Sequence, residues 1–402
     1  MPLIVKAIKR PILKSAFFKP AYHLLFGFAV IFPFNALAQT AQSTPDFETA
    51  AKHAIILDHE TGVVLYEKNA RIPTAPASMT KIMTAQMIFE RLKDGRLTPE
   101  TEFSVSEEAW RRGGKPSGSS TMFLEVNSKA SVEDLLRGVI VQSGNDACIV
   151  LAESIAGSET AFANLMNIRA EELGLTSANF TNATGWPDEG HKISTLDLAR
   201  LARHTIKAHP EYYPIYAEPS FIWNDIKQNN RNPLLGRFTG ADGLKTGHTK
   251  VSGYGLVASA KLADKRRIVV LNGLESKSQR RNESLRVMRA AFDQFKVYKL
   301  FGSGDVVADM PVFMGKSETV KLVVDADVKS GLHRTSRKHL KTQLSYKGSA
   351  PAPIKKGDIL AELLIEEPGR DVRKIPLMAA EDVEIRSAFS RAISAFVNLV
   401  RG

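Results

Sequence analysis

The pattern of hydrophobic and polar residues predicts β-strands in two distant parts of the chain. Segments 54–58 and 63–69 are apolar or alternating, and the polar turn "HETG" joins them. This arrangement predicts a β-hairpin. From Leu244 onward, short turns separate the three strand-like segments "LKTGHT", "YGLVASAKLA" and "RIVVLNGLE". We expect these three segments to form an antiparallel meander.

Helical patterns occupy much of the chain between these strands. One begins at about Ser78, after Pro76, and another follows an S-x-x-D helix cap at Ser131. Residues 104–130 are rich in glycine, serine and lysine and are predicted as a loop. Helices grouped between early and late strands predict a layered α/β (α+β) domain over residues 39–302. The predicted helices are 78–93, 132–142, 146–156, 158–173 and 279–301.

The composition changes after Gly302. The short strand-like runs "TVKLVVDADV", "KTQLSYKG", "DILAELLIEE" and "VRKIPLMA" lie between turns rich in glycine, proline and lysine. They predict a smaller all-β domain over residues 303–384. In residues 385–402, bulky apolar residues recur at helical spacing, opposite arginine and serine residues. Such an amphipathic helix can lie in a membrane interface or can pack on its own domain.

The first 38 residues have the pattern of a secretory signal peptide. They contain five lysines or arginines and no acidic residue, followed by an apolar run over 22–34 and by small residues ending at Ala38. An uncleaved membrane anchor is the alternative, but the run is shorter than the roughly 20 residues that a spanning helix needs. We therefore expect residues 1–38 to be removed on export and exclude them from the fold.

The charge and cysteine content narrow the range of partners. The net charge is +11 over 402 residues, and five of the basic residues belong to the leader. No basic run of the kind that binds nucleic acid is concentrated in one place, so we expect no nucleic-acid partner. A mildly basic exported protein suits anionic lipid or cell-wall polymer. Cys148, the single cysteine, lies in an apolar helical run and is expected in the core.

The first candidate for chemistry is the serine–lysine pair in "PASMTKIMTA". Ser78 and Lys81 are three residues apart, so on a helix they share one face. Serine is a weak nucleophile unless a neighbouring base takes its proton. A lysine desolvated among methionine and isoleucine side chains can have its pKa lowered enough to be that base. The pair therefore predicts an activated nucleophile at a helix N-terminus.

Two further motifs lie far from this pair in the sequence. Residues 143–145, "SGN", form a junction between two predicted helices, and residues 245–247, "KTG", lie on a predicted strand. Each motif alone is a weak signal. Their joint occurrence, each on the element that its chemistry needs, favours one catalytic cleft. A rival S-x-N at residues 177–179 lies in a predicted loop and is the weaker candidate.

The side chains of the second motif complement the serine–lysine pair. The hydroxyl group of Ser143 can relay a proton between Lys81 and a leaving amine. The carboxamide of Asn145 can hold a substrate amide with its donor and acceptor together. The backbone N–H groups of Ser78 and His248 can form an oxyanion hole.

The strand motif supplies groups that suit a substrate carboxylate. Lys245 adds a fixed positive charge, and Thr246 and Thr249 offer hydroxyl groups. Gly247 lets a substrate backbone approach the strand closely. We therefore expect this strand to form one wall of the binding site.

The three motifs together resemble those of low-molecular-mass penicillin-binding proteins, which are serine-type D-alanyl-D-alanine carboxypeptidases. The resemblance covers nearly the whole chain, from the leader through "SMTK", "SGNDA" and "DGLKTGHT" to the β-rich segment and the tail. It implies a serine β-lactamase/transpeptidase-like catalytic domain. It also implies that Ser78 is acylated, that Lys81 is the base, and that Arg231 in "NNRNP" lies near a substrate carboxylate. A solvated loop arginine is the alternative at that position.

The resemblance further implies the substrate and the location. The substrate is the stem pentapeptide of peptidoglycan, whose terminal D-alanine is removed through an acyl-enzyme, and β-lactam antibiotics such as penicillin acylate the same serine. The location is the periplasm, with peripheral attachment to the inner membrane through residues 385–402. Ser119 and Ser120 lie in a loop that can reach the cleft.

Two other functions remain open from the sequence. A β-lactamase shares the acylation step, but Gly144 stands where the lactamase signature has aspartate, and no E-x-x-L-N string lies between Ser143 and Lys245. A catalytically idle wall-binding scaffold is the second alternative. We expect no cofactor and no metal, since the spacing of His191, His204 and His209 matches no metal-ligand pattern.

Overall fold

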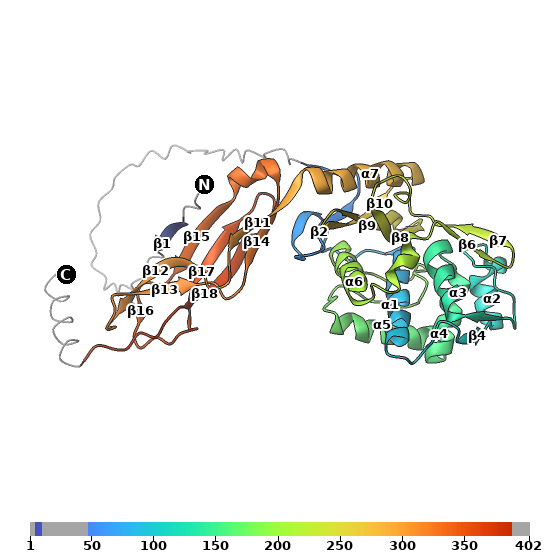
Figure 1. Cartoon of the computed structure of the whole chain (residues 1–402), viewed down its shortest axis with the longest axis horizontal. Coiled ribbons are helices and arrows are strands. Elements are labelled where there is room, and N and C mark those ends of the chain that lie inside the picture. The colour runs from blue at the N-terminus through green and yellow to red at the C-terminus, as the bar shows by residue number, and fades with distance from the viewer. Residues whose placement is uncertain (1–4, 10–46, 388–402) are drawn as a thin grey trace, which may run out of the picture. The chain divides into compact units, whose positions relative to one another are not determined.

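The computed structural model of the chain describes residues 5–9 and 47–387 (Figure 1). The described chain divides into two units. The larger unit comprises Glu48–Tyr298 and Lys329–Arg334, and the smaller one is built around Lys299–Val328 and the described residues from Thr335 onward.

The larger unit contains a five-stranded antiparallel sheet with the strand order β3-β2-β10-β9-β8. The predicted hairpin and the predicted meander are both confirmed. They become one sheet because β10 pairs with β2, with Ile268 opposite Leu57. The strands are β2 His53–Asp58, β3 Val64–Lys68, β8 Ala241–Thr249, β9 Gly253–Leu262 and β10 Lys265–Leu274.

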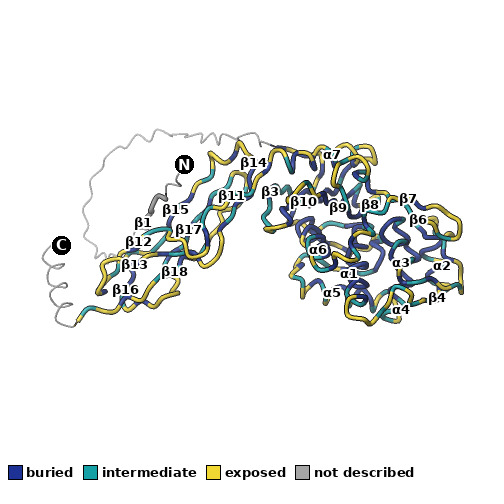
Figure 2. The backbone as a smooth tube through the Cα atoms, viewed as in Figure 1, coloured by how far each residue is buried: buried dark blue, intermediate teal, exposed yellow. Residues whose placement is uncertain are grey.

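Helices cover both faces of this sheet. Helix α7 lies on one side, and α6 and α1 lie on the other (Figure 1). Buried residues run through the sheet and along α1 and α4, where most side chains have no solvent contact (Figure 2). The helices are α1 Lys81–Lys93, α2 Glu107–Gly113, α3 Val132–Arg137, α4 Asn145–Ala156, α5 Glu159–Glu172, α6 Thr195–Ala208 and α7 Lys277–Asp293.

Two sequence expectations differ from the structure of this unit. Residues 104–130 are not all loop, because α2 forms after Ser106, whose hydroxyl oxygen accepts from the N–H of Ala109. The helix expected over 279–301 ends at Asp293, and Phe295–Phe301 forms β11 beside β14, Val328–His333. Alternating aromatic and aliphatic residues favour a strand there. Helix α6 received no prediction.

The smaller unit is an all-β domain, as predicted. Its seven-stranded sheet has the order β1-β15-β17-β18-β13-β12-β16. Strand β17 spans Ile359–Glu366, and its alternate residues Ala361, Leu363 and Ile365 point into the core, which is the period-2 pattern seen in the sequence. The remaining strands are β12 Val306–Phe313, β13 Thr319–Val323, β15 Lys341–Tyr346, β16 Ala350–Pro351 and β18 Arg373–Ala379.

The two ends of the chain lie beyond the predicted domains. Strand β1, Val5–Lys9, pairs in parallel with β15, although the sequence argument had excluded residues 1–38 from the fold. Strand β17 pairs with the other side of β15. Without β1, β15 would be the edge strand of this sheet, to which an added strand can bind. The amphipathic helix predicted for 385–402 lies almost entirely outside the described residues. Among the helices of the described segments, none has both the length and the apolar character to cross a membrane.

Candidate active site

Ser78 lies in a tight turn held between two glycines. The turn is a 3₁₀-helix over Ala77–Thr80 that leads directly into α1. A Cβ atom on Gly247 of β8 would lie 2.6 Å from the carbonyl oxygen of Pro76, and one on Gly185 would lie 1.9 Å from that of Ala77. The turn can therefore approach both segments only because neither glycine has a side chain.

Replacing Gly185 by alanine is expected to destabilise the protein by about 3 kcal/mol, from strain and from the clash together. Gly185 has a φ of +81°, which L side chains rarely adopt. The clash would also displace the turn that carries Ser78, so the rate of acylation should fall with stability. Urea unfolding and the kinetics of acylation by penicillin measure the two effects.

Gly174→Ala is the matched control for this prediction. Gly174 has a φ of +68°, but a Cβ atom added to it would meet no other atom within 4 Å, so this variant suffers only the backbone strain. Equal losses of stability and acylation rate in the two variants would show that the contact with Ala77 does not position Ser78.

Lys81 is the first residue of α1, and its side chain is only 1% exposed. Its Nζ atom donates to Asn145 Oδ1 at 2.7 Å, to the Thr184 carbonyl at 2.5 Å and to Ser78 Oγ at 3.3 Å. Burial lowers the pKa of the Lys81 ammonium group, because the charged form loses its hydration. The neutral amine has two N–H groups, which can stay on Asn145 Oδ1 and the Thr184 carbonyl, and its lone pair is then directed at Ser78 Oγ, which is the geometry of a general base.

The second motif lies where one helical segment ends and the next begins. Ser143 adopts a left-handed backbone conformation after the π-helical turn Gly138–Gln142, and its buried Oγ atom has no hydrogen-bond partner among the described residues. Asn145 begins α4 and donates from Nδ2 to Ser119 Oγ at 3.0 Å. Since Asn145 Oδ1 also accepts from Lys81, both ends of its carboxamide are occupied by the protein. A substrate amide would have to replace one of these bonds.

Asp146, the residue after the motif, fixes the loop that carries Ser119. Its buried carboxylate accepts from Thr121 Oγ1 at 2.6 Å and from the N–H groups of Met122 and Leu124. Burial raises the pKa of this carboxyl group, while these hydrogen bonds act in the opposite direction. The sequence analysis did not identify this role, which depends on contacts between residues far apart in the chain.

Lys245 is deeply buried in the wall of the groove. It is 2% exposed, and within the described chain its Nζ atom has a hydrogen bond only to the Thr246 carbonyl, at 3.4 Å. Burial lowers its pKa well below the ordinary value for lysine, and the nearby Lys81 ammonium lowers it further. The fixed positive charge expected from the sequence stays a prediction. A substrate carboxylate would favour protonation of Lys245.

The remaining predicted residues meet in one continuous groove. Its larger compartment has a volume of about 1040 Å³ and an adjoining one of about 510 Å³, and both are lined by Ser78, Arg231 and His248. Lys81 and Lys245 lie buried beneath this surface. Of the other predicted residues, the larger compartment is lined by Ser143, Thr246 and Gly247, the smaller one by Asn145, Thr249 and Ser119, and both by Ser120.

Several groove residues are held by specific contacts. Arg231 lies in an exposed loop, donates from Nη1 to Ser120 Oγ at 2.6 Å and lines both compartments of the groove. The His248 ring stacks on Tyr254, with ring centroids 3.8 Å apart, and burial lowers its pKa. The Thr249 hydroxyl group pairs with Ser252 Oγ at 2.8 Å, which reduces its freedom to bind a substrate carboxylate.

Arg280 is a groove residue that the sequence analysis missed. It lies in the first turn of α7, is 6% exposed, and donates from Nη1 to the carbonyls of Gly247 at 3.2 Å and Gly255 at 3.4 Å. Its guanidinium group also lies over the Tyr254 ring. No local spacing in the sequence links this helix to the "KTG" strand, so only the fold reveals the contact.

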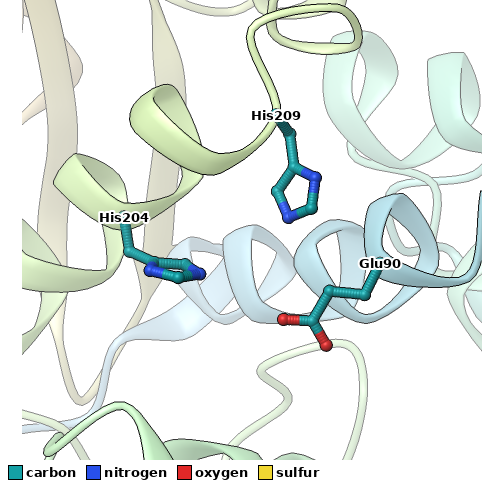
Figure 3. Close-up of side chains that lie close together, drawn as sticks. All are labelled: Glu90, His204 and His209. Atoms are coloured by element: carbon teal, nitrogen blue, oxygen red, sulfur yellow. The ribbon is translucent and has the colours of Figure 1, made fainter. Parts of the chain in front are cut away.

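A separate polar cluster lies on another face of α1. Glu90, His204 and His209 each offer a ligand atom within 4.8 Å of the others, whereas the sequence analysis had considered the two histidines with His191 and not with Glu90 (Figure 3). Arg169 Nε donates to Glu90 Oε1 at 2.8 Å, and Gln86 Nε2 lies 2.8 Å from both Glu90 Oε1 and His209 Nε2. An arginine and an amide thus already bond to Glu90 and His209, and these contacts join α1 to α5 and to the residue that follows α6.

Comparison with known families finds a matching family for each of the two units. Residues 38–275 match the family described as D-alanyl-D-alanine carboxypeptidase, Peptidase_S11. Residues 295–385 match the family described as penicillin-binding protein 5, C-terminal domain. The two matches together span nearly all of the described chain.

Individual relatives agree with these matches. The chain is 34% identical over 376 residues to D-alanyl-D-alanine carboxypeptidase DacD of Escherichia coli K12, covering 92% of this chain and 97% of that protein. A crystal structure of penicillin binding protein 5 from Haemophilus influenzae is similar with a TM-score of 0.66 at 34% identity, covering 85% of this chain and 99% of the other. Penicillin-Binding Protein D2 from Listeria monocytogenes, solved in an ampicillin-bound form, is similar with a TM-score of 0.54 at 28% identity, covering 62% of this chain and 100% of the other.

Proposed function

The chain belongs to the D-alanyl-D-alanine carboxypeptidase family, peptidase S11, and from this premise we propose that Ser78 is the nucleophile of a serine-type carboxypeptidase that trims peptidoglycan stem pentapeptides. One observation carries the assignment of the residues. A buried lysine with a lowered pKa lies 3.3 Å from the Ser78 hydroxyl group, at the base of a groove to which all three motifs contribute.

The first half of the reaction is acylation of Ser78. Neutral Lys81 accepts the proton of Ser78 Oγ as the oxygen attacks the carbonyl carbon between the two terminal D-alanines. The N–H groups of Ser78 and His248 stabilise the oxyanion that forms. Ser143, whose buried hydroxyl group has no partner among the described residues, relays the proton from Lys81 to the departing amine.

The second half releases the shortened peptide. The C–N bond breaks, free D-alanine departs, and the rest of the stem peptide remains as an ester on Ser78. A water molecule then attacks the ester carbonyl, with its proton going to Lys81, and the tetrapeptide acid leaves as Ser78 regains its proton. The reaction consumes one water and yields one D-alanine and one tetrapeptide.

The charge distribution orients the substrate in the groove. Arginines line the larger compartment together with Thr246, so the terminal carboxylate of the substrate belongs there. The smaller compartment contains Asn145 and Trp186 and has no arginine other than Arg231 among the described residues that line it, so it suits the acyl side of the stem peptide. This arrangement puts the scissile bond over Ser78, where the two compartments meet.

Two incubations of the purified protein test this function against its alternatives. With a D-Ala-D-Ala pentapeptide, we expect stoichiometric release of D-alanine, and with penicillin, we expect a covalent adduct that mass spectrometry locates on Ser78. Rapid turnover of penicillin without D-alanine release would identify a β-lactamase. Neither reaction would identify a wall-binding scaffold.

The same proposal includes a location on the outer side of the inner membrane. The sequence of residues 1–38 supports export, and the amphipathic pattern of 385–402 supports peripheral attachment in the interface. Removing residues 388–402 is expected to shift the protein from the membrane fraction to the soluble periplasm. This deletion keeps Arg386, whose N–H donates to the Met314 carbonyl, so the β-domain retains its described contacts.

The tail deletion needs a control for general damage to the protein. Penicillin labelling of the truncated protein should equal that of the full-length protein, because the active site lies in the larger unit. A second variant that retains the tail but replaces Phe389 and Phe396 by serine should also become soluble. Unchanged membrane association of both variants would contradict attachment through this segment.

A further inference from the structure

The segment 180–193, which precedes α6, contacts the turn that carries Ser78. Two of these contacts involve the backbone of the segment. The Thr184 carbonyl accepts from Lys81 Nζ at 2.5 Å, and Gly185 lies so close to the turn that a Cβ atom on it would meet the Ala77 carbonyl. The geometry of the serine–lysine pair therefore depends on where this segment lies.

His191 adds a side-chain contact from the same segment to the same turn. Its Nε2 atom lies 2.8 Å from Oγ1 of Thr80, the residue directly before Lys81. Both side chains are withdrawn from water, since Thr80 is 0% and His191 is 3% exposed. A hydrogen bond between two such groups is stronger than one in water, and its loss leaves a buried polar group unpaired.

The other nitrogen of the ring defines which tautomer is present. The backbone N–H of Thr181 donates to His191 Nδ1 at 3.1 Å, so Nδ1 is an acceptor and has no proton. In the neutral ring the proton is then on Nε2. The Nε2–H group of His191 therefore donates to Thr80 Oγ1.

The surroundings keep the His191 ring neutral. Burial lowers its pKa to about 4, the Asp188 carboxylate acts in the opposite direction, and the Lys81 ammonium group lowers the pKa further. The ring also packs against Phe180, with ring centroids 5.8 Å apart. A proton on Nδ1 would point at the Thr181 N–H group, so protonation would break this contact.

His191 has no direct route to the substrate. It is not among the described residues that line either compartment of the groove, and both of its nitrogens are bonded to the protein. Any effect of His191 on the reaction must therefore pass through Thr80. Since Thr80 lies between Ser78 and Lys81 in the sequence, a shift of Thr80 would change the distance between the hydroxyl group and the amine.

We propose that His191 is a positioning residue for acylation, because its Nε2–H group holds the Thr80 hydroxyl group and so fixes the turn that carries Ser78. This inference rests on the proposed function, because it concerns the same acyl-enzyme. It gives a role to a histidine that the sequence analysis could only exclude from a metal site.

The variants H191Q and H191N test the two ring nitrogens separately. The terminal amide of glutamine can take the place of Nε2 and donate to Thr80, whereas the shorter asparagine reaches only the place of Nδ1. Both variants lose the ring, so their melting temperatures should fall by similar amounts. The measurement is the rate of acylation by penicillin as a function of penicillin concentration.

The expected result is a loss of rate that depends on the donor to Thr80. At saturating penicillin, the rate should stay within about threefold of the wild-type value in H191Q and fall about 10- to 100-fold in H191N, the range for a reacting group misplaced by up to about 1 Å. The half-saturating concentration should not change in either variant, since His191 does not touch the ligand.

Thr80→Val tests the same bond from its other end. It removes the hydroxyl group and keeps the branched shape, so the saturating rate should fall about as much as in H191N. Because both changes break one bond, the double variant T80V/H191N should be no slower than the slower single variant. Thr80→Val also provides the test if H191N does not fold.

H209Q is the matched control. His209 is 2% exposed and its Nε2 atom lies 2.8 Å from Gln86 Nε2, so it also joins α1 through a buried ring, but it does so more than one turn beyond Lys81. This variant should lose stability and keep the wild-type rate of acylation.

The outcomes separate the possible errors. Equal rates in H191N and H191Q, a wild-type rate in Thr80→Val, or additive losses in the double variant would each overturn the proposal. A doubly protonated His191 ring at neutral pH, measured by nitrogen NMR, would also overturn it. Absence of acylation in the wild type would refute the proposed function, whereas wild-type acylation with an unimpaired H191N refutes only the positioning role.

Discussion

Replacing Ser78 by alanine is expected to abolish both D-alanine release and covalent labelling by penicillin. Removal of the nucleophile leaves no oxygen that can form the acyl-enzyme, and losses of about 10⁴-fold or more in kcat are typical of such variants. Release of D-alanine from a pentapeptide and mass spectrometry of the penicillin-treated protein measure the two effects. Persistent labelling of the variant would place the nucleophile elsewhere.

The loss should not come from unfolding. The Ser78 side chain makes one hydrogen bond to another described side chain, the 3.3 Å contact with Lys81, so its removal leaves the packing of the turn intact. The melting temperature of the variant should stay within about 2 °C of the wild-type value, since surface substitutions usually change stability by no more than about 0.5 kcal/mol. Ser128→Ala, which removes an exposed hydroxyl group bound to the Glu125 carbonyl, is the control and should keep full activity.

The sequence pointed to the proposed catalytic groups because each motif is local. Ser78 and Lys81 share a helix face at a spacing of three, and Ser143 and Asn145 flank a helix junction, so their relative positions follow from secondary structure alone. The bond between Lys81 and Asn145 joins residues that are 64 positions apart. This contact could be expected from the sequence only because the chemistry of the motifs requires them to lie in one site.

Contacts that depend on tertiary packing could not be inferred in this way. Arg280 reaches Gly247 only because α7 packs on the sheet, and Glu90 meets His204 and His209 only because α1 and α6 lie side by side. The buried state of Lys245 is another example. The sequence predicts a charged residue on a strand. In the structure, the described neighbours of Lys245 exclude water from its side chain and offer it no carboxylate.

The strands of the fold were predictable where a single hydrophobic periodicity ran through a segment of the sequence. The hairpin, the meander and the four strands predicted in the smaller unit have clear alternation, and all are present, as β13, β15, β17 and β18 in the last case. The segment "FKVYKLF" follows a helix without a proline or glycine break, so the helical pattern was extended over it. The structure ends α7 at Asp293 because Phe295–Phe301 pairs with β14, and tertiary pairing overrode the local continuity.

Two buried lysines without carboxylate partners among the described residues dominate the electrostatics of the site. Burial lowers the pKa of both Lys81 and Lys245, and the positive charge of Lys81 disfavours protonation of Lys245. A substrate carboxylate that enters the groove beside Lys245 offsets this effect, since it stabilises the protonated lysine. Lys81 can then stay neutral until it receives the proton of Ser78.

The second large effect is expected for Lys81→Met. Methionine keeps the length and the apolar part of the side chain but cannot accept a proton, so acylation by pentapeptide and by penicillin should slow by about 10³- to 10⁴-fold, the upper range for a general base. The rate of the wild-type protein should rise with pH as Lys81 loses its proton, at a pH below the ordinary lysine value because the pKa is lowered. Stopped-flow acylation across a pH series measures both effects. A variant that retained the same pH-dependent rise would show that another group is the base.

Stability provides an independent test of the same lowered pKa. Between the folded pKa of Lys81 and the unfolded value of about 10.5, the unfolded chain binds one more proton than the native chain, so the free energy of unfolding increases with pH. Below the folded pKa, both states are protonated and the contribution is constant.

Lys81→Met leaves Asn145 Oδ1 and the Thr184 carbonyl without this donor, which adds an offset that does not depend on pH. Lys245 remains in both proteins, so its own titration largely cancels in the comparison. The wild type should therefore gain stability relative to the variant as pH rises, by about 1.4 kcal/mol per unit within that window. Denaturant unfolding at several pH values measures this difference, and a difference that stays flat up to pH 10.5 would mean that Lys81 is an ordinary charged lysine in the folded protein.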